Sequence, residues 1–178
     1  MLQKCSTLKV AEIFFIEPSK PHYLIEISKK SKLAHTSVKK HLNTLLKQSI
    51  IKKKREKKGS RIFPTYIANI DNNNYKFYKR IFNKIKLEKS GFVEFIQKKL
   101  MPNSIVLFGS YENGEDTEKS DIDLFLECKK TEISTEKFEK KLKRRIELHY
   151  NTKFNKYPNE LKNNIVNGTV LYGYLEAY

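Results

Sequence analysis

The stretch that decides the fold reads SIVLFGS from Ser104 to Ser110, then YENGEDTEK, then SDIDLFLEC from Ser120 to Cys128. Each end of the stretch is an apolar run of strand length, and the first run closes in a Gly-Ser turn. Asp121 and Asp123 open the second run with one residue between them. Because successive side chains of a strand point to opposite faces, both carboxylates are expected on the same face.

Two carboxylates that share one face of a strand indicate a cation site. Like charges repel each other, and they lose hydration when partly buried unless an opposite charge is present. Mg²⁺ prefers oxygen ligands and keeps part of its coordination shell for water and phosphate oxygens. Gly109 allows close backbone approach, and the amides and Ser110 hydroxyl of the turn can hold phosphate oxygens. The stretch therefore predicts a site for a metal ion and a phosphate group.

These motifs resemble the signature of the DNA polymerase β-type nucleotidyltransferase superfamily, in which a Gly-Ser pair precedes Asp-x-Asp on a strand. In this chain the matching residues are Gly109, Ser110, Gly114 and Ser120 to Leu124. The sequence is most similar to the minimal nucleotidyltransferases, which include the antitoxins of HEPN–MNT toxin–antitoxin pairs. The tail from Lys141 to Gly173 is similar to the family's ending of helix, strand, helix and short strand. The resemblance covers about residues 91–175 and implies a small α/β domain with a mixed sheet.

The resemblance also assigns roles to individual residues. Gly109 and Ser110 would bind the phosphates of a nucleoside triphosphate, with ATP as the expected substrate. Asp121, Asp123 and Glu147 would bind Mg²⁺ or Mn²⁺, and Glu147 would help to deprotonate the attacking hydroxyl. The implied enzyme moves a nucleoside monophosphate, AMP by expectation, to a hydroxyl of a protein or nucleic acid and releases pyrophosphate.

The chain departs from the family pattern in two places. The third acid of the family is more often aspartate, whereas Glu147 is longer by one methylene. Between Ser110 and Gly114 the family often carries arginine, which this chain lacks, and Lys119 or Lys130 is expected to compensate. His149 is interpreted as an ordinary surface histidine, and Ser110, with no neighbouring base, is not expected to be a covalent nucleophile.

Charge divides the chain into two halves. The 178 residues carry a formal net charge of +16, and residues 1–87 hold 21 Lys and Arg against five Asp and Glu. Residues 88–178 hold 15 of each and are neutral. An AT-rich genome would spread lysine evenly, so the asymmetry indicates a basic module that meets a polyanion.

The basic half resembles the winged helix-turn-helix domains of microbial regulators over about 65 residues, on pattern rather than on a diagnostic motif. Apolar residues predict helices near 8–15, 24–32 and 35–48, the last with Thr36 or Ser37 as N-cap and a stripe of Val38, Leu42, Leu45 and Leu46. The runs IIKKK and SRIFPTYI predict a hairpin with a basic tip. The resemblance places the third helix in the major groove and the hairpin on phosphate or the minor groove. The expected nucleic-acid contacts are Thr36, Ser37, Lys39, Lys40, Asn43, Lys57, Lys58 and Arg61. A solvated lysine face and a protein-binding winged helix remain alternatives.

The predicted fold is therefore α+β, with three segments: a winged helix-turn-helix over 1–70, a helical connector over 71–90 and a nucleotidyltransferase domain over 91–178. The aromatic stripe of the connector, from Tyr75 to Ile85, is expected in a core or an interdomain seam rather than stacked on bases. Winged-helix proteins often dimerise, so a homodimer is a further expectation.

Three functions remain open at this point. The first is the enzyme targeted to DNA or RNA by the winged helix. The second is a DNA-binding regulator whose nucleotidyltransferase-like domain is inactive or senses nucleotide, and the third is an antitoxin that modifies a protein such as a toxin.

The two cysteines, Cys5 and Cys128, indicate no disulfide framework or zinc site, and the first residues lack a signal-peptide pattern. No apolar run is long enough for a membrane span, so a cytoplasmic location is expected.

Overall fold

The computed structural model describes residues 5–152, 154 and 159–176. The chain divides into two compact units, residues 1–79 and 80–178. The division falls inside one helix, α4 (Asn73–Ser90), which contributes residues to both units. The domain limits assigned from the sequence, near residues 70 and 90, stay predictions.

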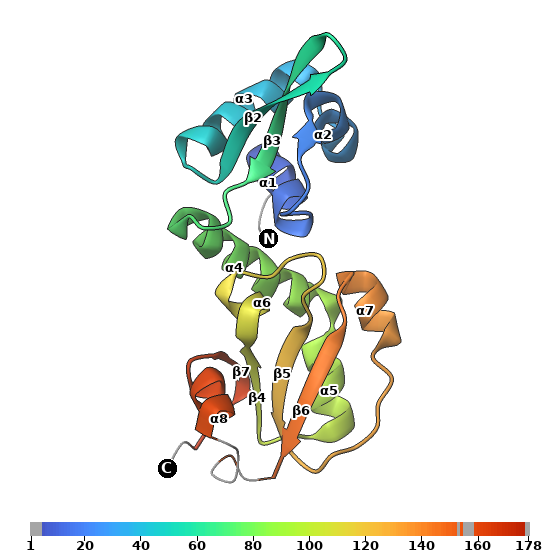
Figure 1. The fold of residues 1–178 in the computed structure, drawn as a ribbon. Coiled ribbons are helices and arrows are strands. Elements are labelled where there is room, and N and C mark those ends of the chain that lie inside the picture. The colour runs from blue at the N-terminus through green and yellow to red at the C-terminus, as the bar shows by residue number, and fades with distance from the viewer. Residues whose placement is uncertain (1–4, 153, 155–158, 177–178) are drawn as a thin grey trace. The chain divides into compact units, whose positions relative to one another are not determined.

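The first unit combines three helices with a small antiparallel sheet (Figure 1). Its elements are α1 (Ser6–Ile16), β1 (His22–Tyr23), α2 (Leu24–Ser31), α3 (His35–Lys47), β2 (Ile51–Lys58) and β3 (Arg61–Ala68). The strand order is β1-β3-β2, and β2 and β3 form a hairpin in which Lys58 is paired with Arg61. The predicted helices and the predicted hairpin are confirmed at nearly the expected bounds.

The apolar stripe of α3 explains how this helix packs. Val38, Leu42 and Leu45 are buried, at 0–1% exposure, and they share one face because they are three or four residues apart. The predicted N-cap is wrong: α3 begins at His35, its N-cap is Ala34, and no side chain caps it. Thr36 and Ser37 lie inside the first turn, two and three residues after Ala34, so their hydroxyls come too late to act as the cap.

The start of α4 packs on the first unit. Tyr75 is buried, its hydroxyl donates a hydrogen bond to the Phe14 carbonyl at 3.1 Å, and its ring lies 5.5 Å from the ring of Phe15. Other members of the predicted aromatic stripe, Phe77 and Tyr78, are 56% and 42% exposed. Throughout the described residues, no helix combines the length and apolar character that crossing a bilayer requires.

The second unit is a four-stranded mixed sheet with helices on both faces (Figure 1). After α4 its elements are α5 (Phe92–Leu100), β4 (Ser104–Phe108), α6 (Gly109–Asn113), β5 (Ile122–Glu127), α7 (Glu136–Leu142), β6 (Ile146–Asn151), α8 (Asn159–Val166) and β7 (Thr169–Gly173). The strand order is β6-β5-β4-β7, with β5 and β6 parallel and the other pairs antiparallel. The predicted strand, turn and strand, and the predicted order of the tail, are confirmed.

Alternation along the strands sends apolar side chains to both faces of this sheet. One face, covered by α4, α5 and α7, buries Leu87, Phe92, Val93, Ile96, Ile105, Leu107, Tyr111, Ile122, Leu124, Leu126, Phe138 and Leu142. The other face buries a smaller set, Val106, Phe108, Phe125, Phe154 and Ile165, with Ile165 supplied by α8. The central strands β4 and β5 are therefore apolar on both faces, which fixes their position in the sheet.

A buried carboxylate anchors the short helix α6. The Glu112 side chain is 2% exposed, and its Oε1 accepts bonds from Arg80 at 2.7 Å, Lys84 at 3.1 Å and the Thr169 hydroxyl at 2.9 Å. Burial raises the pKa of the Glu112 carboxyl, but the hydrogen bonds from Arg80, Thr169 and Lys84 outweigh burial, so the pKa lies below its ordinary value. The carboxylate thus ties α6 to α4 and β7.

A second polar group holds the loop that follows α6. Asp116 is 2% exposed and accepts bonds from Asn83 at 2.8 Å and from Arg144 at 3.3 Å. Asn83 also donates to the Tyr111 carbonyl at 2.8 Å. The bonds from Asn83 attach the segment between β4 and β5 to α4, and each of these buried polar groups has a partner.

Glu112→Gln is expected to lower the free energy of unfolding by about 2 kcal/mol at pH 7, since the cations would lose a buried anionic partner. The lowered pKa means that Glu112 stabilises the fold above its unfolded-state pKa, near about 4.3. That contribution is lost as the pH falls through the lower folded-state pKa, so variant and wild type should converge in stability only below that folded-state pKa. The difference in the free energy of unfolding between variant and wild type is measured by urea unfolding, monitored by circular dichroism, at several pH values.

The matched control is Glu94→Gln, which removes a carboxylate that is 67% exposed and pairs with Lys98 along α5. An exposed pair of this kind contributes little to stability, so Glu94→Gln should unfold close to wild type. Equal stability of wild type and Glu112→Gln at pH 7 would contradict the anchoring role.

Candidate active site

The parallel pairing of β5 with β6 brings two predicted site residues together. The register sets Asp123 beside Glu147 and Phe125 beside His149. On β5, Ile122 and Leu124 point into the larger core, so Asp123 between them must point to the opposite face. Ile146 and Leu148 on β6 pack against the same core and turn Glu147 to the face that carries Asp123.

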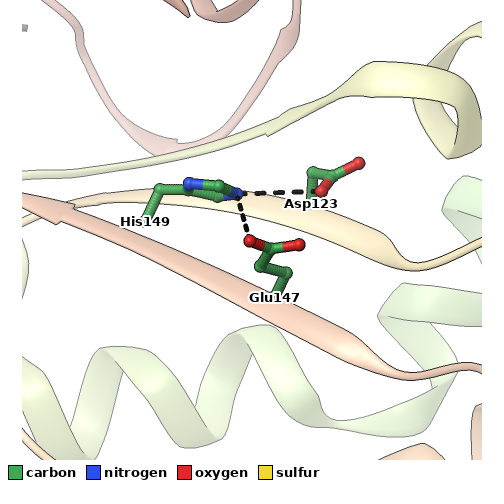
Figure 2. A group of neighbouring side chains, drawn as sticks. All are labelled: Asp123, Glu147 and His149. Atoms are coloured by element: carbon green, nitrogen blue, oxygen red, sulfur yellow. Dashed lines mark ion pairs between the residues drawn. The ribbon is translucent and has the colours of Figure 1, made fainter.

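The resulting cluster contains a third residue, His149, which lies two positions after Glu147 on the same face of β6 (Figure 2). The His149 Nε2 atom lies 3.7 Å from Asp123 Oδ1 and 3.8 Å from Glu147 Oε1. One ligand atom from each residue lies within 4.8 Å of the others. The side chains of Asp123 and His149 are 23% and 21% exposed, and that of Glu147 is 58% exposed. The cluster is therefore open to a ligand on the Glu147 side.

The interpretation of His149 as an ordinary surface histidine is wrong. Its Nε2 is buried without a hydrogen-bond partner, and its ring lies 5.2 Å from the ring of Phe108. The signal was in the sequence, because the alternation that selected Glu147 also selects the residue two positions later.

Gly109 lies against the cluster at the end of β4. Phe108 pairs with Asp123, so Gly109 is the first residue beyond the paired strand. Its φ is +76°, and a Cβ at this position would lie 2.5 Å from Asp123 Oδ2. Glycine is therefore required twice, by the backbone conformation and by the contact with the carboxylate.

Ser110 follows in the first turn of α6, and with Gly109 it lines a cavity of about 200 Å³. The other residues of this cavity are Glu112, Asn113, Glu115, Asn164, Asn167 and Gly168. The turn thus joins the carboxylate cluster to a polar cavity that is formed by α6 and the end of α8.

Asp121 and Lys119 line a different pocket from the one lined by Gly109 and Ser110. β5 begins at Ile122, so Asp121 precedes the ladder that aligns Asp123 with Glu147, and it is not a member of the group around His149. Asp121 lines an open pocket of about 550 Å³ together with Lys119, Glu118, Ser120, Glu139, Lys140, Lys143, Arg144 and Arg145. The structure therefore brings Asp123, Glu147 and Gly109 together and leaves Asp121 and Lys119 beside a second pocket.

The predicted nucleic-acid contacts lie on the first unit. Lys39, Lys40 and Asn43 are exposed on α3, on the side opposite the buried stripe. Lys57 and Arg61 are exposed at the tip of the hairpin, while the side chain of Lys58 lies outside the described residues. The first unit therefore exposes basic side chains on both α3 and the hairpin.

The second half of the chain matches a known family. Residues 92–176 match the family model described as "Polymerase beta, Nucleotidyltransferase". The matched segment contains Gly109, Ser110, Asp121, Asp123 and Glu147 and agrees with the resemblance seen in the sequence. No curated protein gives a significant match to the chain.

Gly109→Ala is expected to displace the Asp123 carboxylate and to weaken divalent-ion binding at the cluster at least about tenfold, because the new Cβ and Oδ2 cannot both keep their places. Gly91→Ala is the matched control: Gly91 has φ +79° but nothing within 4 Å of an added Cβ. Both variants should lose about 1 kcal/mol or more of stability from backbone strain. Isothermal titration with Mn²⁺ measures the ion affinity of both variants. Equal affinities would contradict the claim that a side chain at position 109 displaces the Asp123 carboxylate.

Proposed function

We propose that the second unit is a nucleotidyltransferase that moves a nucleoside monophosphate, AMP as first candidate, from a nucleoside triphosphate to a hydroxyl of a protein or nucleic acid. The observation that carries the proposal is the pair Asp123 and Glu147, held side by side in one register next to the Gly109-Ser110 turn. The pair lies in the segment that matches the nucleotidyltransferase family model.

The turn is proposed to receive the phosphates. Gly109 has no side chain between its backbone and the carboxylate cluster, and Ser110 adds a hydroxyl at the rim of the cavity beside it. Backbone amides and a hydroxyl at such a turn suit phosphate oxygens. Asp121 and Lys119 line the neighbouring pocket, and the family resemblance gives them a further metal contact and a phosphate contact.

Asp123 and Glu147 would hold a divalent ion, and their oxygens suit Mg²⁺ or Mn²⁺. A bound ion supplies stabilisation of the charge that builds up on the transferred phosphate. Glu147, at 58% exposure, can accept the proton of the attacking hydroxyl at a carboxylate oxygen. The acceptor oxygen then bonds to the α-phosphorus, the bond from that phosphorus to the bridging oxygen breaks, and pyrophosphate leaves.

The test is incubation of the pure protein with each labelled nucleoside triphosphate, Mg²⁺ or Mn²⁺, and total cell protein or RNA as acceptors. Wild type should transfer label, and Asp123→Asn and Glu147→Gln should each lower the rate by about 10²–10³-fold. Asp121→Asn tests the role that the resemblance gives to this residue. The labelled triphosphate that gives transfer identifies the nucleotide, and the appearance of label in protein or in RNA identifies the class of acceptor.

Glu127→Gln is the matched control, because Glu127 lies on the same face of β5 as Asp123 but bonds to Ser104 at 3.2 Å instead of the cluster. It should retain the wild-type rate. No transfer by wild type to any acceptor would reject the enzyme and leave the regulator with a silent or nucleotide-sensing domain.

We further propose that the first unit binds DNA or RNA as a winged helix-turn-helix. The support is the charge of residues 1–87 and the exposed Lys39, Lys40, Lys57 and Arg61 on α3 and the hairpin. Contacts from these cations to phosphates release counterions, so the affinity should fall steeply with salt. In this arrangement the first unit would direct the transferase to its acceptor or to its own operator.

Replacing Lys39, Lys40, Lys57 and Arg61 by alanine should reduce the slope of log affinity against log salt by up to about 3.6, at about 0.9 for each phosphate contact. Fluorescence anisotropy with a labelled duplex at several salt concentrations measures the slope. The control removes four exposed lysines of the second unit, Lys98, Lys99, Lys129 and Lys130, for the same loss of charge. A slope that changes equally in both variants would show a general charge effect and reject the assigned surface.

A further inference from the structure

The carboxylate cluster contains a nitrogen that needs a partner. The His149 Nε2 atom is buried and makes no hydrogen bond, although two carboxylate oxygens lie just beyond hydrogen-bond distance, at 3.7 and 3.8 Å. A buried polar atom without a hydrogen-bond partner destabilises a fold. Its position, pointing at Asp123 and Glu147, indicates that a ligand completes the group (Figure 2).

The spacing of the three ligand atoms suits a small metal ion. Ligand atoms at about 2.1 Å from a tetrahedral ion lie about 3.4 Å from one another. The distances from Nε2 to the two carboxylate oxygens exceed this by only a few tenths of an ångström. The third separation, between the two carboxylate oxygens, is at most 4.8 Å, so rotation of the exposed Glu147 side chain would bring the three atoms onto one ion.

The backbone holds the imidazole in place for this role. His149 belongs to the β5–β6 ladder, where it is paired with Phe125, and its ring packs against Phe108 at 59° between the ring planes. Asp123 is bounded on its other side by the Gly109 backbone. Two of the three ligands are therefore held by their surroundings, which limits the reorganisation needed on binding an ion.

We propose that Asp123, Glu147 and His149 form one cation site, with His149 as a metal ligand that shifts its preference from Mg²⁺ toward first-row transition ions such as Mn²⁺ or Zn²⁺. Mg²⁺ strongly prefers oxygen ligands in octahedral geometry, whereas imidazole suits transition ions. The inference rests on the proposed function for its purpose, since it names the ion of that reaction, but ion binding itself can be measured without turnover. Asp121, outside the group, is not needed for it.

The experiment measures ion binding by the full-length protein without nucleotide. Isothermal titration with Mn²⁺ and with Mg²⁺ gives the ratio of the two affinities. Electron spin echo spectra of the Mn²⁺ complex report directly whether an imidazole nitrogen is bound to the ion. Wild type should show the nitrogen coupling, and the Mn²⁺ affinity should exceed the Mg²⁺ affinity at least about tenfold.

Two substitutions at the same position separate a ligand from a packing residue. His149→Ala should lose the nitrogen coupling and lower the Mn²⁺ affinity at least about tenfold, with a smaller change for Mg²⁺. His149→Asp should restore ion binding with an all-oxygen site, so the Mn²⁺/Mg²⁺ ratio should fall while Mg²⁺ binds at least as well as in wild type. Circular dichroism melting curves establish that both variants are folded, and His35→Ala, at an exposed histidine of α3, should match wild type.

Absence of nitrogen coupling in wild type, or an unchanged affinity ratio in His149→Ala, would overturn the proposal. Failure of the transferase is distinguishable from failure of this inference. If the protein binds Mn²⁺ through His149 but transfers no label, the metal site stands and the proposed enzyme is rejected. If the protein transfers label but the ratio of its Mn²⁺ and Mg²⁺ affinities does not depend on His149, the proposed enzyme stands and the histidine ligand is rejected.

Discussion

The parallel pairing of β5 with β6 is the constraint on which the candidate site depends. A shift of one residue in this register would move Glu147 and His149 to the larger core and expose Ile146 and Leu148. The crossover between the strands stabilises the register, because Phe138 and Leu142 of α7 pack in that same core. The apolar pattern of three elements thus determines where two carboxylates and an imidazole meet. No interaction among the polar residues themselves is needed to bring them together.

The turn between β4 and β5 is positioned by a different kind of interaction. α6 has five residues, too few to be stable by itself, and it is held by the contacts of Glu112 with α4 and β7. Buried charge is destabilising unless it is paired, so these contacts have a function beyond stability. They fix the orientation of the Gly109-Ser110 turn relative to Asp123, which packing of such a short helix could not do alone.

Much of this architecture could be predicted from the sequence because it follows from short-range patterns. The β2–β3 hairpin, the apolar face of α3 and the strand, turn and strand around Gly109 are each encoded within one short continuous stretch of the sequence. The N-cap of α3 was predicted wrongly because Thr36 and Ser37 are good N-cap residues, whereas the observed cap, Ala34, uses no side chain. The pairing of Glu112 with Arg80 could not be predicted, since these residues are 32 positions apart and carry no motif.

The site shows the same division. Asp123 and Glu147 were chosen by alternation and resemblance, and the ladder brings them together. His149 has the same alternation, but a lone histidine is far more often a surface residue, and only the ring contact with Phe108 and the buried Nε2 distinguish it. Asp121 shares the motif with Asp123 but precedes the first residue of β5, so the ladder does not set its position and its metal contact stays a prediction.

The charge distribution adds an argument about how the two units divide their work. The first half carries the whole net charge of +16, and the second half, which holds the carboxylates, is neutral. The proposed attraction to a polyanion would therefore be salt-dependent and would come from a different half of the chain than the proposed cation site. Joining the two on one chain raises the effective concentration of any acceptor attached to that polyanion around the second unit. In the proposed enzyme the acceptor site could then be weak and open, because the binding strength would come from the lysines of α3 and the hairpin.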